Sequence, residues 1–135
     1  MGAWSVDAFG NNDAGDWALG LKNCTDLSLV DATLDKVLAA GEYIEAPDTS
    51  EALAAIEVIA RLQGNWGERN AYTEDVDNWV LKTKLQPGSD LAQKAYRVID
   101  RILSDQSELK ELWQDGDEFD AWRASVENLK ARVNA

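Results

Sequence analysis

Two pairs of carboxylates in the chain are spaced as metal ligands could be. Glu42 and Glu45 form one i, i+3 pair, and Glu74 and Asp77 form a second, with 28 residues between the pairs. Carboxylate oxygens are the protein ligands that Mg²⁺ prefers, and a bound Mg²⁺ can polarise a phosphoryl group for hydrolysis. The spacing therefore indicates an oxygen-ligated metal site as one hypothesis.

This spacing is similar to that of the all-α nucleotide pyrophosphohydrolases, which would imply an Mg²⁺-dependent hydrolase. Two observations weigh against that function. Glu42 and Glu45 lie between Gly41 and Pro47, in a connection between helical patterns rather than inside one. The chain also has 25 acidic residues, so i, i+3 pairs occur by chance. The hydrolase is kept as an alternative function, and we predict no metal ligand, catalytic residue or cofactor.

The composition excludes several kinds of catalytic and metal-binding site. The chain has no histidine, which excludes Ser-His-Asp and Cys-His catalysis and His-ligated metals. Its single cysteine, Cys24, cannot form an intrachain disulfide and sits beside no cationic cluster, so we interpret it as structural. The net charge of −12 argues against nucleic acid as a partner, because binding phosphates requires lysine and arginine.

The negative charge is concentrated in two regions. Residues 1–60 carry a net charge of −9, and residues 105–120 carry −6. Such charge can serve solubility alone, or it can steer a basic protein to a docking face. For the second case we predict a partner-binding patch near the C-terminus, made of Trp113, Asp115, Asp117, Glu118 and Asp120. An aromatic anchor surrounded by acidic side chains is a common interface arrangement.

The elements that must position these residues have a helical period. Apolar residues recur every three or four positions in six segments, at 26–40, 48–63, 73–83, 89–104, 107–114 and 119–133. Residues 1–11 and 64–72 are rich in Gly, Asn and Trp and are expected to be ordered loops. No segment has the alternation of a strand. We therefore predict one all-α domain over residues 1–135, a compact bundle of about six or seven helices.

The segment at 48–63 is apolar on nearly every side, which predicts a central helix. Asp48 with Glu51 three positions later has the spacing of a capping box, so the helix is expected to begin there. Glu57 lies inside this apolar segment and needs a partner if it is charged. Arg61, four residues later, is the predicted partner.

Three long motifs follow one another along the chain. They are MGAW at 1–4 with Phe9 and NDAGDW at 12–17, EYIEAP at 42–47 with SEALAAIEVIA at 50–60, and SELKELW at 107–113. Together they resemble the bacterial domain-of-unknown-function family 4259, with Ser5 where glycine is usual. The resemblance implies an all-α bacterial cytosolic protein and supplies no catalytic residues.

Small acidic proteins of this kind are similar in profile to toxin-neutralising immunity proteins. We therefore expect a non-enzymatic protein-binding module, such as an immunity-type inhibitor of a basic toxin or nuclease. A structural or housekeeping domain without a dedicated site is the third alternative. The first twenty residues have no basic residue and no apolar run spans a membrane, so we expect a cytoplasmic protein, a monomer or weak dimer.

Overall fold

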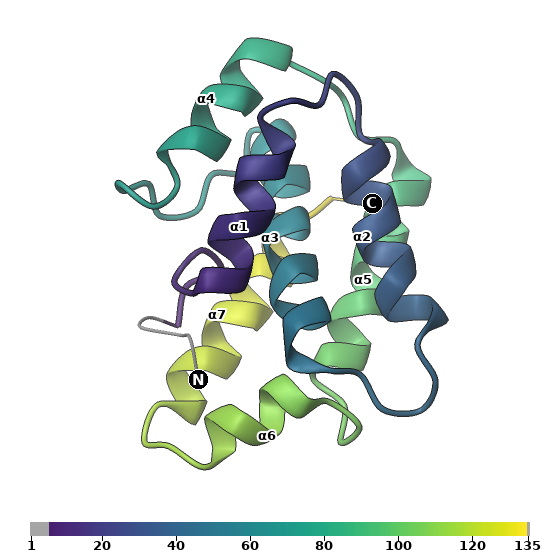
Figure 1. Cartoon of the computed structure of the whole chain (residues 1–135), viewed down its shortest axis with the longest axis vertical. Coiled ribbons are helices and arrows are strands. Elements are labelled where there is room, and N and C mark those ends of the chain that lie inside the picture. Colours follow the sequence, from purple (N-terminus) through teal and green to yellow (C-terminus); the bar gives the residue numbers. More distant parts are fainter. Residues whose placement is uncertain (1–5, 135) are drawn as a thin grey trace.

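A computed structural model describes residues 6–134 of the chain and arranges them as an all-α bundle (Figure 1). The seven helices in this range are α1 (Asn12–Leu21), α2 (Ser28–Ala39), α3 (Ala46–Leu62), α4 (Glu74–Thr83), α5 (Ser89–Ile102), α6 (Glu108–Gln114) and α7 (Phe119–Arg132). The fold class and the number of helices predicted from the sequence are confirmed. None of these helices combines the length and apolar character needed to cross a bilayer.

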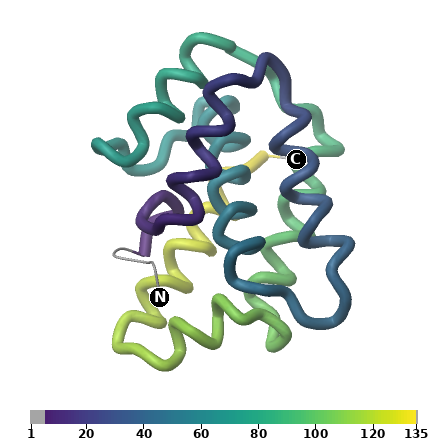
Figure 2. The backbone as a smooth tube through the Cα atoms, in the orientation of Figure 1, coloured from purple at the N-terminus to yellow at the C-terminus, as the bar shows by residue number. Residues whose placement is uncertain are grey.

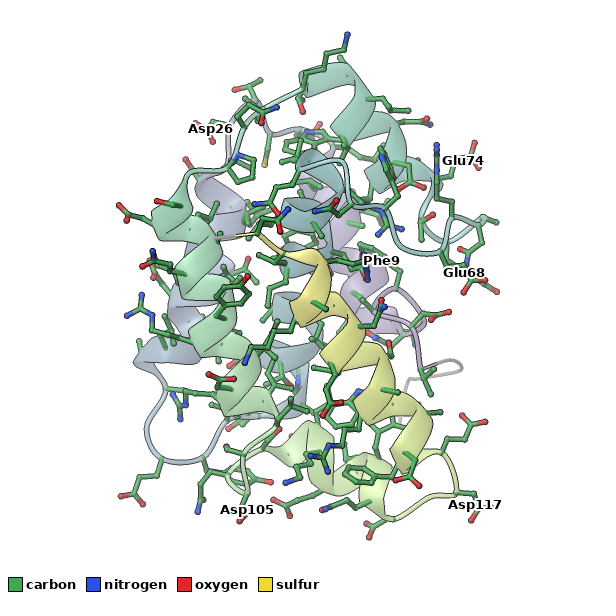
Figure 3. The ribbon with its side chains drawn as sticks, turned by 180° about the vertical axis from the view of Figure 1, so that it is seen from behind. Phe9, Asp26, Glu68, Glu74, Asp105 and Asp117 are labelled. Carbon is green, nitrogen blue, oxygen red and sulfur yellow. The ribbon has the colours of Figure 1, made fainter. Side chains whose placement is uncertain are left out.

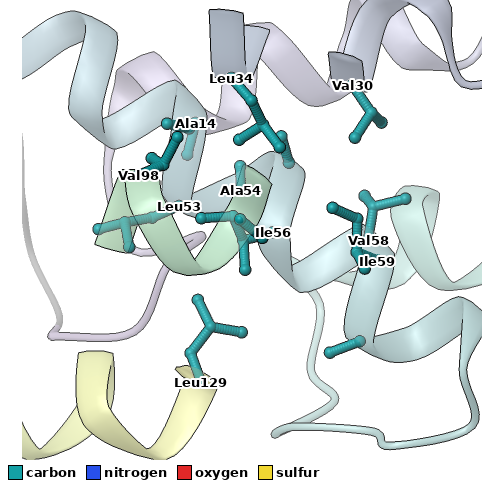
Figure 4. Close-up of a cluster of buried hydrophobic side chains, with 14 of the residues drawn as sticks. Ala14, Val30, Leu34, Leu53, Ala54, Ile56, Val58, Ile59, Val98 and Leu129 are labelled. Carbon is teal, nitrogen blue, oxygen red and sulfur yellow. The ribbon is translucent and has the colours of Figure 1, made fainter. Parts of the chain in front are cut away.

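Helix α3 is the centre of the bundle, as its apolar sequence predicts. It packs against each of the other six helices, and all but its first turn and Glu51 are buried. The core around it contains Leu34 of α2, Ile56 of α3, Val98 of α5 and Leu129 of α7 (Figure 4). One central helix surrounded by six others explains why neither face of α3 shows a polar stripe.

Helix α1 is not among the six segments that the sequence predicts. Its apolar side chains Ala14, Trp17, Ala18 and Leu21 have helical spacing and are buried. Gly15 and Gly20 lower the intrinsic helix propensity of this segment and obscure the pattern. The helix is fixed instead by tertiary contacts, since the Trp17 indole packs against the core and its Nε1 donates a hydrogen bond to Thr33 Oγ1 of α2 at 2.8 Å.

The predicted start of the central helix is wrong by two residues. Helix α3 begins at Ala46 and includes Pro47 in its first turn, so Asp48 is not the N-cap. The cap comes from elsewhere in the chain, because the Ala46 amide donates a 2.7 Å hydrogen bond to Glu108 Oε1 of α6. Pro47 has no amide to satisfy, and the distant carboxylate of Glu108 satisfies the amide of Ala46.

Ile44 joins the same two regions through the backbone. Its amide donates to the Gln106 carbonyl at 2.9 Å, and its carbonyl accepts from the Glu108 amide at 3.0 Å. The Ile44 side chain is fully buried. These bonds fix α6 across the end of the bundle at which α3 starts, and α4 lies at the opposite end (Figure 2).

Candidate functional site

The four carboxylates of the metal hypothesis lie at opposite ends of α3. Glu45 is the N-cap residue of α3. Asp77 of α4 lies near the other end of α3, because it accepts a 2.7 Å hydrogen bond from Arg61 in the last turn of α3. At 1.5 Å per residue the two ends are separated by about 24 Å. Among residues 6–134, no group of three or more acidic or cysteine side chains could hold a metal ion. The convergence that the hydrolase hypothesis requires of these four residues is absent.

Instead, Asp77 belongs to a set of charges that we call the ion cluster, formed by Glu57, Arg61, Asp77 and Arg132, of which the first three are buried and Arg132 is half-buried. The predicted pair of Glu57 and Arg61 is confirmed. Arg132 of α7 binds the same carboxylate with two bonds, 3.0 Å from Nη1 to Oε1 and 2.7 Å from Nη2 to Oε2. Arg61 thus bridges two carboxylates, and Glu57 is held by two guanidinium groups.

The groups around the ion cluster complete its hydrogen bonds. Thr73 Oγ1 donates to Asp77 Oδ2 at 2.7 Å, and Arg61 Nη2 donates to the Glu68 carbonyl at 2.6 Å. The Arg61 guanidinium also lies 5.8 Å from the ring centres of Phe9 and Trp66. Every charge in the ion cluster therefore has an opposite charge and further polar contacts, which is the condition for burying such groups. Its evident role is to fasten α3, α4, α7 and the loop at 64–72 together.

Two cavities lie on either side of Glu57 and Ser125. The first, which we call the apolar cavity, has a volume of about 190 Å³ and lies between residues 6–13, α3, α6 and α7. Its apolar walls come from Val6, Ala8, Ala46, Pro47, Leu53, Leu109, Leu112, Trp113, Trp122, Val126 and Leu129. The second, the polar cleft, has about 690 Å³ and is lined in part by Arg61 and Arg132 of the ion cluster.

The mouth of the polar cleft brings two carboxyl groups together. Asp7 and Glu68 both line it. The protonated Glu68 carboxyl donates a hydrogen bond to Asp7, and this bond raises the pKa of Glu68 above its ordinary value. The negative charge of Asp7 raises it further, and desolvation makes a smaller contribution. Phe9 and Glu68 lie on the same side of the molecule, next to α7 (Figure 3).

The predicted partner-binding residues are adjacent but differ in exposure. Asp115, Asp117, Glu118 and Asp120 are exposed, and Asp117 projects from the α6–α7 turn (Figure 3). These four carboxylates form no ion pair within the described part of the chain. Trp113 is only 8% exposed, and its ring stacks on that of Trp122 at 6.4 Å. Its indole belongs to the core and does not form an exposed anchor.

Two other residues supply exposed apolar surface there. Leu112 follows Glu111 on the outer face of α6 and is 37% exposed, and Tyr43, in the connection before α3, is 44% exposed. Neither residue belongs to the patch predicted from the sequence. Tyr43 is distant from α6 in the sequence, and the backbone bonds of Ile44 bring it there. We call the surface formed by Tyr43, Glu111, Leu112, Asp115, Asp117, Glu118 and Asp120 the acidic end.

The pKa of Tyr43 is raised above its ordinary value by burial and by neighbouring carboxylates. Desolvation of the phenol raises its pKa, and a hydrogen bond to Glu111 adds to the effect. The negative charges of Glu111, Glu108 and Glu45 raise it further. An ionised phenol is disfavoured near other negative charges, so this surface repels anions and would attract cations.

The acids of the N-terminal half are arranged differently. Lys94 of α5 lies 2.5 Å from Asp31 Oδ1 and 2.7 Å from Asp35 Oδ1 of α2. Lys36 lies within 4 Å of both Asp48 and Glu51 of α3. Much of the negative charge of residues 1–60 is therefore partly neutralised between helices.

Comparison with known proteins gives one result. The family model described as "Domain of unknown function (DUF4259)" matches residues 2–125. Neither the curated proteins nor the solved structures include a match to this chain. Since the matched range spans nearly the whole sequence, the chain belongs to the DUF4259 family, a family of unknown function.

Proposed function

We propose that this protein is a non-enzymatic binding module that recognises a basic protein partner through the acidic end. Within that class we propose an immunity-type inhibitor, which blocks a basic toxin or nuclease by covering its functional surface. The observation that supports the proposal is the exposed, unpaired group of carboxylates beside exposed Leu112 and Tyr43. An apolar contact area with a charged rim is the usual anatomy of a protein interface.

The charge supports a specific way of binding. Asp115, Asp117 and Glu118 lie at the turn between α6 and α7, and Asp120 lies in the first turn of α7. None of them forms an ion pair with the residues at 6–134, so their field is available to an approaching protein. Steering of this kind raises the association rate and weakens as salt screens the charges over about 10 Å.

Site-specific crosslinking tests where the partner binds. A photo-crosslinking amino acid replaces Leu112 in one variant and Leu81 in the other. Each variant is produced in cells of the source organism, and the cells are irradiated. Leu81 is the matched control, since it is 50% exposed but lies on α4, at the other end of the bundle. We expect a basic protein to be crosslinked at position 112 and not at 81. Equal products at both positions would contradict the proposal.

The charge is tested on the identified partner. The variant Asp115→Asn/Asp117→Asn/Glu118→Gln removes three charges from the acidic end. The control Asp16→Asn/Glu74→Gln/Asp90→Asn removes three exposed charges elsewhere. We expect the association rate to fall with added salt for the unmodified protein and the control, and to be slower and less salt-dependent for the acidic-end variant. A rate that is insensitive to salt in all three proteins would exclude steering.

A further inference from the structure

The apolar cavity adjoins the acidic end but is not part of its exposed surface. Leu112 belongs to both, because its side chain is exposed on α6 and also lines the cavity. Trp113, the next residue, forms a wall of the cavity together with Trp122. A partner seated on the acidic end would therefore lie next to the cavity entrance.

The size of the cavity limits what can enter it. At about 190 Å³ it is somewhat larger than an engineered apolar cavity of about 150 Å³ that binds benzene. It is smaller than the roughly 300–1,000 Å³ of pockets that bind substrates or cofactors. The volume fits one aromatic side chain, and the stacked indoles of Trp113 and Trp122 offer the aromatic edges and faces against which another ring packs well.

The charge of the cavity walls indicates which residues would stand next to the aromatic side chain in the partner's sequence. Asp7, Asp13 and Glu57 line the cavity, and no lysine or arginine is among its described lining residues. Glu57 is neutralised by Arg61 and Arg132, and Asp7 shares a hydrogen bond with Glu68, so the exposed carboxylate of Asp13 sets the local charge. The polar cleft, in contrast, has Arg61 and Arg132 in its lining. An aromatic ring next to cationic groups complements the apolar cavity.

We propose that the apolar cavity receives one aromatic side chain, flanked by lysine or arginine, from the basic protein partner. This inference rests on the proposed function and specifies the chemistry of the partner. The ring would pack against Trp113 and Trp122, and the flanking cations would face Asp13 and the carboxylates of the acidic end. The expected ligand is thus a short basic segment with an aromatic residue at its centre.

Three blocked tripeptides test the proposal by NMR titration of the full chain. They are lysine–phenylalanine–lysine, lysine–alanine–lysine and glutamate–phenylalanine–glutamate. We expect the first to bind at least about tenfold more tightly than either of the others, the ratio that burial of a phenyl group gives. Its binding should shift the resonances of Leu53, Trp113 and Ser125, which line the cavity.

Matched variants locate the binding site. Ser125→Leu fills part of the cavity, and we expect it to weaken the phenylalanine peptide by about tenfold or more. Ala121→Leu, on the same helix, lines only the polar cleft and should leave the affinity unchanged. If Ser125→Leu does not fold, Asp13→Lys serves instead, and it should reverse the preference between the lysine and glutamate peptides that carry phenylalanine.

Two outcomes would overturn this inference. If the phenylalanine and alanine peptides bind equally, only surface charge is being recognised, and the proposed function stands without the cavity. If the phenylalanine peptide binds only after Trp4→Ala, the occupant of the cavity is the chain's own residue 4. Failure of the proposed function itself is recognised separately, by equal crosslinking at positions 112 and 81.

Discussion

Carboxylates in the ion cluster and at the acidic end occupy opposite environments. Glu57 and Asp77 are buried, and each is bonded to a guanidinium group, Glu57 to two of them. Asp115 and Asp117 are exposed on a turn and have no ion pair in residues 6–134. A buried charge without a partner costs several kcal/mol, whereas an exposed one costs almost nothing. The first region therefore serves the fold, and the second is free to serve recognition.

Removing Arg61 is expected to have the largest effect on the difference between the two regions. Arg61→Met leaves Asp77 without its closest cation and Glu57 with one guanidinium fewer, and we expect a loss of about 3–5 kcal/mol of unfolding free energy. Urea denaturation measures it. The control Arg123→Met breaks the exposed pair with Glu127 and should cost less than about 0.5 kcal/mol. Similar losses in the two variants would show that the ion cluster is not a structural centre.

Neighbouring residues of α6 separate core from surface. Trp113→Ala should lower the unfolding free energy by about 3 kcal/mol, because a buried indole that stacks on Trp122 is lost. Leu112→Ala should cost less than about 1 kcal/mol, since the side chain is more than a third exposed. Thermal or urea unfolding distinguishes the two variants. A larger loss of unfolding free energy for Leu112→Ala would show that Leu112, and not Trp113, is the core residue of α6.

The paired acids of the N-terminal half make a smaller, pH-dependent contribution. Hydrogen bonds to Asp31 and Asp35 raise the pKa of Lys94 above its ordinary value of 10.5. A raised lysine pKa means that the folded chain holds the proton more tightly than the unfolded chain. Lys94 therefore stabilises the fold below about pH 10.5, and this contribution disappears as the pH rises above that value.

Comparison with Lys94→Met measures that contribution. The stability difference between the two proteins should be less than about 1 kcal/mol near neutral pH and should shrink at alkaline pH. Urea unfolding of both proteins across this range provides the measurement. A difference that grows with alkaline pH would have the wrong sign for this pair.

The smallest expected effect reports on the acidic end without a partner. Glu111→Gln should lower the pKa of Tyr43, because it removes a charge beside the phenol. The titration is followed by tyrosinate absorbance, and subtracting the curve of Tyr43→Phe isolates this residue. Asp117→Asn is the control, since Asp117 is not among the groups that raise the pKa of Tyr43. An unchanged pKa in Glu111→Gln would remove the evidence for a strong negative field at this position.

Local patterns in the sequence predict most of the fold. Six of the helices follow from the spacing of their apolar residues, and the pair of Glu57 and Arg61 follows from its i, i+4 spacing. Helix α1 was not predicted, because two glycines weaken its helical pattern. Trp113 was predicted at the interface because its neighbours are acidic, although its position on the inner face of α6 buries it.

The candidate site depends on contacts that no local pattern contains. Arg132 reaches Glu57 across 75 positions, and Glu108 reaches Ala46 across 62. Such contacts depend on how whole helices pack, which a single sequence does not encode in its spacing. The four carboxylates of the metal hypothesis lie apart for the same reason, because similar spacing in two segments does not indicate that the segments meet.

The bonds between Arg132 and Glu57 also bear on where this domain can be cut. The family match ends at residue 125, inside α7, whereas Leu129, Arg132 and Val133 lie beyond it and contribute to the core or the ion cluster. A fragment trimmed to the matched range would lose seven residues of α7 from Val126 to Arg132, and with them the second cation that holds Glu57. The physical boundary of the folding unit therefore extends at least to Val133, past the boundary that sequence similarity draws.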